Sequence, residues 1–373
     1  MKTKKVLLAF AALGLMMAFS SKEAIQREWE QSAHNNGVMG AKTLSVATVE
    51  ARGEAAAHCA RCHSEQGFLA WLEQLKKGNP ENLVGPDGKP ATLDYLKGLG
   101  LTQAQVRPIT CKTCHDEDGD LRLVHDTPML PSGFQATAVG NAALCITCHN
   151  SRNGRITWNA EDAGRYTYPH ASSQGDVLLG KNAYFVDDTR EWPNPHAFFT
   201  GNACSTCHMS LAGTGEYTSH TFKTPENLCA SCHGAKYTKE MVQENVEHLL
   251  SLIRSKVNAR VLMVRDRIKT VRAYNPDNGQ FTPNVAVKAP VYRVEILSIA
   301  GQIAFKMTLT DGTVLYSQLG DIKDEKGQAV FSTKDPVVRA AWNYLLIQND
   351  GSKGIHNPTY VRQVLLATLK ALQ

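Results

Sequence analysis

The most regular pattern of apolar and polar positions lies in the last third of the chain. Between Lys239 and about Arg272, apolar residues recur at steps of three and four. This spacing places them on one stripe and predicts a long amphipathic helix. The turn-forming run Asn-Pro-Asp-Asn-Gly at 275–279 follows and ends it.

A period of two replaces this pattern in the next segment. Residues 291–298 and 303–317 alternate between apolar and polar positions and are rich in Val, Ile, Tyr and Thr, and Asp311-Gly312 divides the second run. They predict a small antiparallel β excursion. Two predicted helices close the chain, Asp335 to about Gln348 and Pro358 to Leu372. Asn357 and Pro358 suit the N-cap and the first position of the second helix.

The N-terminus has the features of an export signal. Residues 1–20 contain three lysines, then an apolar run of 14 residues from Val6 to Phe19, with small residues at Ala18 and Ser20. The run is shorter than the roughly 20 residues that a membrane-spanning helix needs. We therefore predict a signal peptide at 1–20 and an exported, periplasmic or extracellular protein. No later segment is long and apolar enough to span a bilayer, so we expect no transmembrane anchor in the mature chain.

Composition narrows the class of protein. The 373 residues are 43% hydrophobic and 20% charged, which excludes a wholly disordered chain. The net charge of +5 includes three lysines of the predicted signal, so the remainder carries +5 − 3 = +2. This charge is too small and too scattered to predict nucleic-acid binding.

The ten cysteines point to the chemistry, because all of them fall into five copies of Cys-x-x-Cys-His. The cysteines are Cys59, Cys62, Cys111, Cys114, Cys145, Cys148, Cys204, Cys207, Cys229 and Cys232, and the histidines are His63, His115, His149, His208 and His233. In such a run, two thiols one helical turn apart bind the vinyl groups of a porphyrin, and the adjoining histidine ligates its iron from the proximal side. We therefore predict five covalently attached haem c groups.

Three other uses of cysteine fit this pattern less well. Zinc sites pair Cys-x-x-Cys units, but five units do not divide into four-cysteine sites, and zinc does not require a histidine after each unit. A thioredoxin-like dithiol would occur once, beside a βαβ pattern that is absent here. Structural disulfides would suit an exported chain, yet they give no reason for uniform spacing.

The positions of the motifs predict the architecture. All five lie between Cys59 and His233, in 175 residues or about 35 for each haem. With so little polypeptide around each porphyrin, the haems must supply much of the apolar core, and turn-rich segments such as 128–133 and 191–195 break the chain between them. We expect a mainly α, haem-packed fold with little regular structure around the haems. The predicted domains are a pentahaem cytochrome c domain at 21–238 and a C-terminal segment at 239–373.

The remaining histidines decide whether each iron keeps an open face. Beyond the five proximal residues, eight remain: His34, His58, His125, His170, His196, His220, His248 and His356. Every iron could therefore have histidine on both sides, which leaves no position for a substrate. Three of the eight are weaker candidates. His248 lies on the polar face of the predicted helix, His58 is rotated away from its own haem, and His125 adjoins Asp126.

The surroundings of the other histidines resemble a known family. The matching segments are WEQSAH at 29–34, CITCHNSR at 145–152, PH at 169–170, CSTCHM at 204–209 with SHTF at 219–222, and NDGSKGIHNP at 349–358. They are similar to multihaem c-type cytochromes of the group that contains pentahaem nitrite reductase and hydroxylamine-oxidoreductase-like proteins. The resemblance implies distal iron ligands at His34, His170, His196, His220 and His356, the last returned to a haem by the closing helices.

One departure from that family concerns the catalytic haem. Its nitrite reductases carry one Cys-x-x-Cys-Lys motif, whose lysine leaves the opposite face of the iron open, whereas every motif here ends in histidine. This difference weakens the nitrite reductase interpretation.

The sequence thus predicts an exported pentahaem c-type cytochrome that transfers electrons along closely packed bis-histidine haems, a carrier rather than an enzyme. Its expected partners are redox proteins or an extracellular electron acceptor. Two alternatives stay open: a reductase of a small nitrogen or sulfur oxyanion at one open haem, and a homo-oligomeric subunit of an extracellular haem filament. Haem propionates need basic neighbours, a use that we predict for residues such as Arg152, Arg155 and Arg165.

Overall fold

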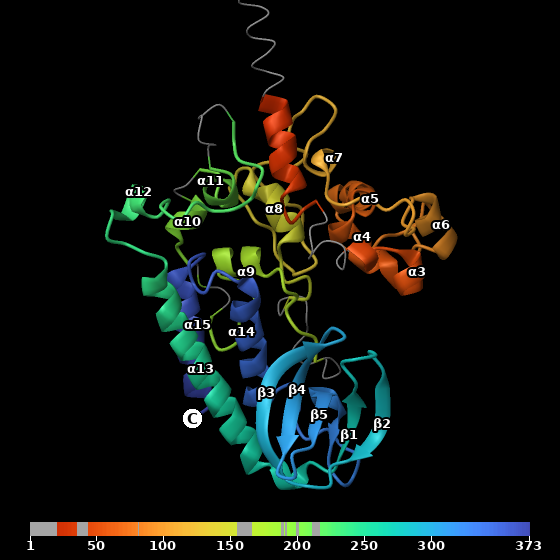
Figure 1. Ribbon diagram of the computed structural model, residues 1–373, viewed down its shortest axis with the longest axis vertical. Coiled ribbons are helices and arrows are strands. Elements are labelled where there is room, and N and C mark those ends of the chain that lie inside the picture. Colours follow the sequence, from red (N-terminus) through yellow and green to blue (C-terminus); the bar gives the residue numbers. More distant parts are fainter. Residues whose placement is uncertain are drawn as a thin grey trace, which may run out of the picture. The chain divides into compact units, whose positions relative to one another are not determined.

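The computed structural model describes most of the chain (Figure 1). The described residues are 21–35, 44–80, 82–154, 166–187, 190, 192–198, 201–210 and 217–373. The predicted signal peptide at 1–20 lies outside them, as do two of the predicted propionate partners, Arg155 and Arg165. Within these ranges, no helix combines the length and the apolar character needed to cross a membrane.

The chain forms two compact units, and each draws on separated stretches of sequence. Unit 1 comprises Met1–Met129, Ala136–Cys148 and Phe198–Ala235, and unit 2 comprises Leu130–Gln135, His149–Ala197 and Lys236–Gln373. Unit 1 therefore holds all ten cysteines. Unit 2 holds the predicted C-terminal segment together with residues 149–197, which the motif pattern had assigned to the haem region.

Unit 1 is built from short helices. Residues 21–30 are helical. The helices that follow are α3 (Val49–Arg52), the 3-10 turn η1 (Gly53–Ala55), α4 (Ala56–His63), α5 (Glu65–Lys76), α6 (Leu93–Gly98), α7 (Cys111–Cys114), α8 (Ala142–Cys148), α11 (Cys204–His208) and α12 (Ala230–His233). α5 buries Phe68, Trp71 and Leu75, which helical spacing places on one side. Gly67 lets α5 approach α4, because a Cβ there would lie 2.4 Å from the Ala60 carbonyl oxygen.

Unit 2 combines helices with two small antiparallel sheets. Its helices are α9 (Gln174–Leu179), α13 (Glu240–Met263), α14 (Pro336–Asp350) and α15 (Pro358–Ala371), with 3-10 turns η2 (Arg265–Arg267) and η3 (Leu319–Asp321). One sheet has the order β2 (Phe281–Ala286), β1 (Thr270–Tyr274), β6 (Ile322–Lys323), and the other has the order β3 (Val291–Ile299), β4 (Gln302–Leu309), β5 (Val314–Gln318). The fold is thus mixed helix and antiparallel sheet, a broader class than the mainly α fold that we expected.

A stripe of α13 and most of α14 form the core of unit 2. α13 buries Val246, Leu250, Ile253, Val257 and Val261, at steps of three and four. α14 is enclosed on nearly all sides, since eleven of its 15 residues are buried. It contacts α9, α13, α15, β3 and β4. The helix α14 is therefore held in place by packing on several sides.

The long helix ends earlier than the apolar pattern predicted. α13 ends at Met263, and Ile268 and Val271, which continue the stripe at helical spacing, are buried instead just before and within β1. Val271 pairs with Val285 of β2 and with Ile322 of β6. β-branched residues favour strands, so pairing with distant strands overrides the local period here.

The predicted turn at Asp311-Gly312 and the predicted N-cap Asn357 are confirmed, and Asp335 is a further N-cap. Asp311 and Gly312 lie in the turn between β4 and β5. The first closing helix begins after Asp335, whose Oδ1 accepts a hydrogen bond from the Val337 N–H at 2.8 Å. The second begins after Asn357, whose side chain accepts one from the Tyr360 N–H at 3.1 Å. Both residues are N-caps.

Truncation of the α13 stripe should destabilise the protein. Ile253 is fully buried, so Ile253→Ala leaves a cavity, and we expect the free energy of unfolding to fall by about 2–5 kcal/mol. Leu252→Ala is the matched control, because Leu252 is 40% exposed and should cost far less. Urea unfolding followed by far-UV circular dichroism measures both variants. Equal losses would contradict the packing described for this helix.

Candidate haem sites

Each Cys-x-x-Cys-His motif lies on a short helix. The five helices are α4, α7, α8, α11 and α12, and each ends at the second cysteine of its motif or at the histidine that follows. Because a turn takes about 3.6 residues, the two cysteines of a motif lie on one side of the helix. Two thioether bonds to one porphyrin require this arrangement.

The attachment segments touch one another within unit 1. The Cys145 thiol forms a hydrogen bond with the Cys204 thiol, and the Cys148 thiol forms one with that of Cys62. The third motif therefore contacts the first and the fourth. Burial, and then the charges of the two cysteines of the fifth motif, raise the pKa of Cys207. The fourth motif thus lies beside the fifth.

The second motif completes this set. Burial, and then the nearby charge of Cys145, raise the pKa of Cys114 to about 12. Cys145 belongs to the third motif, so the second motif also lies beside the third. The contacts therefore connect all five attachment segments.

Hydrogen bonds to Nδ1 orient two of the proximal histidines of unit 1. His115 Nδ1 lies 2.8 Å from the carbonyl oxygen of Gly119, and His208 Nδ1 lies 3.1 Å from that of Phe222. A carbonyl oxygen can only accept a hydrogen bond, so Nδ1 carries the proton and the neutral ring has its lone pair on Nε2. This is the tautomer that ligates a metal through Nε2.

The segment Ser219–Phe222, the SHTF of the sequence, also brings predicted distal ligands together. His220 Nδ1 lies 2.9 Å from the Thr218 carbonyl oxygen, and the His220 N–H donates to Glu28 Oε2 at 2.8 Å. The ring of His34 packs edge-on against Phe222, with centroids 4.3 Å apart. One short segment thus contacts the helix at 21–30 and orders two predicted ligands.

The rings of His115 and His220 are neighbours. Their centroids are 6.5 Å apart and their planes are inclined by 32°. Two imidazoles on opposite faces of one metal ion, each at a metal–nitrogen distance of about 2.0 Å, have ring centres about 6 Å apart. Burial lowers the pKa of His220, which keeps its imidazole neutral. The pair therefore suits the two axial positions of one iron.

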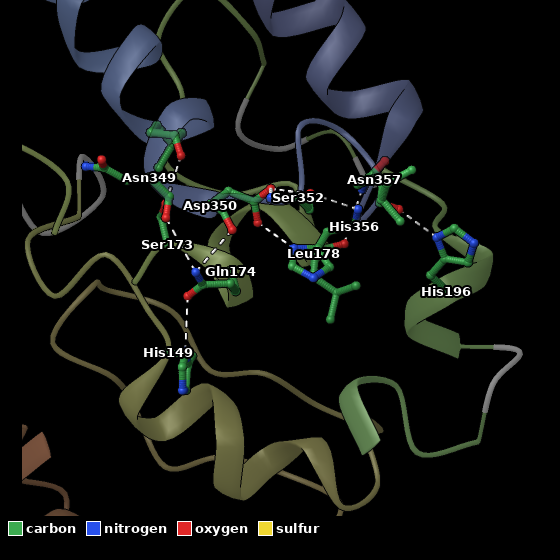
Figure 2. A network of polar contacts seen from close by, with 12 residues as sticks. His149, Ser173, Gln174, Leu178, His196, Asn349, Asp350, Ser352, His356 and Asn357 are labelled. Carbon is green, nitrogen blue, oxygen red and sulfur yellow. Dashed lines mark hydrogen bonds and ion pairs between the residues drawn. The ribbon is translucent and has the colours of Figure 1, made fainter. Parts of the chain in front are cut away.

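In unit 2 the segment 349–357 positions two predicted distal ligands (Figure 2). His356 Nδ1 lies 2.5 Å from Asp350 Oδ1. His196, on α10 (Pro195–Phe198), has its Nδ1 2.8 Å from the Ile355 carbonyl oxygen. Gly354, at φ 96°, packs this segment onto α13, because a Cβ there would lie 2.8 Å from a methyl group of Val246.

The segment 349–357 is also linked to the proximal histidine His149, through the side-chain amide of Gln174. His149 Nδ1 lies 3.2 Å from Oε1 of Gln174, and Gln174 Nε2 donates to the carbonyl oxygens of Asp350 at 3.1 Å and Asn349 at 3.4 Å. Figure 2 shows this chain of contacts from His149 to the end of α14. Three predicted iron ligands of unit 2 thus depend on one segment.

His170, the remaining predicted distal ligand, adjoins a buried carboxylate. Its Nδ1 lies 2.8 Å from Ser172 Oγ, and its N–H donates to the Ser151 carbonyl oxygen. Asp176 accepts bonds from the Ser151 N–H and Oγ and from Asn182 Nδ2 at 2.6–2.7 Å. Burial raises the pKa of Asp176 to about 6, although these bonds lower it. The carboxylate fixes the residues that follow the third motif.

The three weaker candidates have different surroundings. His248 is exposed on α13, as its place on the polar face predicted. His125 is exposed, with a left-handed backbone at φ 68°. His58 has an Nδ1 bond of the same kind as the predicted ligands, 2.5 Å to Asn82 Oδ1.

Sequence reasoning missed the oxygen atoms that orient these rings. Gln174 and Ser172 are ordinary polar residues in the sequence, and Ile355 acts through its backbone, 159 positions from His196. Asp350 had one available signal, since it lies near the predicted end of a helix and shortly before His356.

A haem propionate would explain one buried arginine atom. Arg152 Nε is buried and has no hydrogen-bond partner among the described residues. A buried guanidinium needs an acceptor, and a propionate is a charged one. Among all the residues that the structure describes, no group of three or more His, Cys, Asp and Glu side chains forms a site for a bare metal ion. The paired thiols and the oriented imidazoles are therefore the kinds of group that bind haem c.

Comparison with known proteins agrees with this chemistry. No family model matches the chain. The sequence is similar to the C-type polyheme cytochrome OmcB of two strains of Geobacter sulfurreducens, with 22% identity over 302 residues that cover 61% of this chain and 39% of the relative. The match supports a multihaem c-type cytochrome. The chain spans less than half the length of these curated relatives.

One solved structure is also similar. The crystal structure of the Outer Cell Wall Cytochrome OcwA matches with a TM-score of 0.47 and 18% identity, covering 93% of this chain and 50% of that one. The finer resemblance to nitrite reductase and hydroxylamine-oxidoreductase-like proteins stays a prediction.

The buried Asp176 should make stability depend on pH. Its pKa is about 6 when folded against an ordinary 3.8, so protonation favours the folded state. As the pH falls from 7 to 4, the unfolding free energy of the natural protein should rise relative to that of Asp176→Asn, by up to about 3 kcal/mol. Urea midpoints at several pH values measure the difference. Asp311→Asn is the control of opposite sign, since hydrogen bonds from Thr313 lower the pKa of Asp311. A pH-independent difference for Asp176→Asn would contradict the assignment.

Proposed function

We propose that this chain is an exported pentahaem c-type cytochrome that transfers electrons between bis-histidine haems. Each motif would attach one haem through its two cysteines and bind the iron through its own histidine. The distal ligands would be His34, His170, His196, His220 and His356. Export rests on the signal-like residues 1–20. The chain would exchange electrons with redox proteins or with an acceptor outside the cell.

The observation that carries this proposal is the pair His115 and His220. The two residues are candidate ligands for independent reasons, since His115 belongs to a Cys-x-x-Cys-His motif and the surroundings of His220 resemble those of family ligands. Their ring centroids are 6.5 Å apart, a separation that suits two axial ligands of one iron. We assign this pair to the second haem. Histidine on both faces keeps iron six-coordinate and leaves no site for a substrate.

Contacts among the attachment segments support transfer from haem to haem. Thiols of the third motif touch those of the first and fourth, and the fourth motif lies beside the fifth. Haems bound to touching segments lie near one another, so electrons can pass between porphyrins without leaving the chain. An electron carrier needs this proximity at every haem, whereas an oxyanion reductase needs one open iron.

Haem stoichiometry tests the attachment sites. A pyridine haemochrome assay should give five haems per chain, one for each motif. The double variant Cys111→Ala, Cys114→Ala should give four, because the second motif loses both thioether bonds, and intact mass spectrometry should show the loss of one haem. Ser231→Ala, inside the fifth motif but not an attachment residue, should keep five. A wild-type count other than five would overturn the pentahaem proposal.

Removal of a distal ligand tests the bis-histidine assignment. His220→Ala should convert one ferric haem to the high-spin form and let the reduced protein bind one equivalent of carbon monoxide, because one iron loses an axial imidazole. The unchanged protein and His248→Ala should bind none, since His248 is exposed on α13. Electronic absorption and electron paramagnetic resonance spectra measure the spin state. Carbon monoxide binding by the unchanged protein would favour the reductase instead.

A further inference from the structure

Asp350 gives His356 a charged partner. The Asp350 side chain is fully buried, with Oδ1 2.5 Å from His356 Nδ1. Its second oxygen accepts hydrogen bonds from the hydroxyl and the N–H of Ser352, which also holds the His356 N–H through Oγ at 3.2 Å. Figure 2 shows Asp350 with contacts to both residues. The carboxylate is therefore fixed in its orientation toward the imidazole.

The place of this carboxylate is unfavourable for a negative charge in two ways. Burial removes the water that would solvate it. Asp350 is also the last residue of the 15-residue helix α14, whose C-terminal end carries a partial negative charge and favours cations. Residues that break local rules without a gain in stability are expected at functional sites. A function that uses the charge itself would account for this placement.

The other predicted ligands whose Nδ1 partner is described have neutral acceptors. These are the carbonyl oxygens of Gly119, Thr218, Phe222 and Ile355, the hydroxyl of Ser172 and the amide of Gln174. At these other histidines, neutral acceptors orient the ring, and a neutral group costs less free energy to bury than a carboxylate does. The carboxylate of Asp350 orients the ring of His356 in the same way and also places a negative charge beside it.

We propose that Asp350 sets the reduction potential of the haem that His356 ligates, lowering it below the value that a neutral partner would give. This inference rests on the proposed function, because it requires His356 to bind iron. A carboxylate that accepts from Nδ1–H makes the imidazole a stronger donor through Nε2. Hydrogen bonding to an axial ligand is one of the protein's means of tuning haem potentials.

The charge acts on the balance between the two oxidation states. Reduction adds one electron to the iron, while the proton stays between His356 Nδ1 and Asp350 in both states. The negative carboxylate and the negative end of α14 favour the ferric state, which has one more positive charge. The carboxylate contacts the ring of His356 directly, whereas His149 contacts the neutral amide of Gln174, so we expect the largest effect at the haem that His356 ligates.

Asp350→Asn tests the proposal, because asparagine keeps an acceptor for His356 and removes the charge. In a spectroelectrochemical titration of the full haem-loaded chain, one of the five components should move to higher potential. We expect the ferrous-to-ferric ratio of that component at a fixed potential to rise about tenfold, or about 59 mV for one electron. The low-spin electron paramagnetic resonance signal of the same haem should change its g values, and no high-spin signal should appear.

Asp335→Asn is the matched control. Asp335 caps the other end of α14 and bonds to the Val337 N–H, and asparagine is also a good N-cap. This variant removes the same charge from the same helix, and all five components should keep their potentials.

Three outcomes would overturn the proposal. Unchanged potentials and g values in Asp350→Asn would show that the charge has no effect on the iron. A high-spin signal in Asp350→Asn would make Asp350 a support that only holds the ring in place. A separate variant, His356→Ala, should create one high-spin haem. If its haems all stay low-spin, the assignment of His356 as a ligand is wrong. That failure is distinguishable from the first two, because it appears without any change at Asp350.

Discussion

An imidazole has two nitrogens, and the partner of one decides what the other can do. Within the described part of the chain, an oxygen atom lies near Nδ1 of at least seven of the ten histidines proposed to bind iron. Each bond fixes the rotation of a ring and leaves Nε2 with its lone pair. Without such bonds, a histidine on a short helix or a loop would sample several rotamers, and no fixed axial position would exist. The rest of the architecture supplies these acceptors.

Two short segments supply many of them. In unit 1, Ser219–Phe222 contributes a ligand of its own, the carbonyl oxygen for His208 and the aromatic ring against His34. In unit 2, residues 349–357 hold His356 and His196 directly and His149 through Gln174. Ser219–Phe222 is neither helix nor strand, and 349–357 begins with the last two residues of α14 and continues as turns and bends. Each is fixed by regular elements around it, by the helix at 21–30 through Glu28 and by α13 and α14 respectively.

The features that sequence could predict are those that depend on a few consecutive residues. The cysteine pairs needed only their spacing, and the two closing helices needed only Asp335 or Asn357 before a proline. The features that it could not predict depend on distant partners. Val271 continues a helical period, yet it pairs in a sheet with Ile322. The acceptor for His196 is a backbone atom 159 positions away, and no side chain at that position encodes it.

Gly354 connects the proposed iron ligands of unit 2 to a helix that carries no haem motif. Its contact with Val246 leaves no space for a side chain, so the segment 349–357 keeps its place only while α13 stays packed. Denaturant that loosens α13 would free both distal imidazoles of this segment in the same step. The colour of the protein would then serve as a folding probe for a helix without a haem attachment motif.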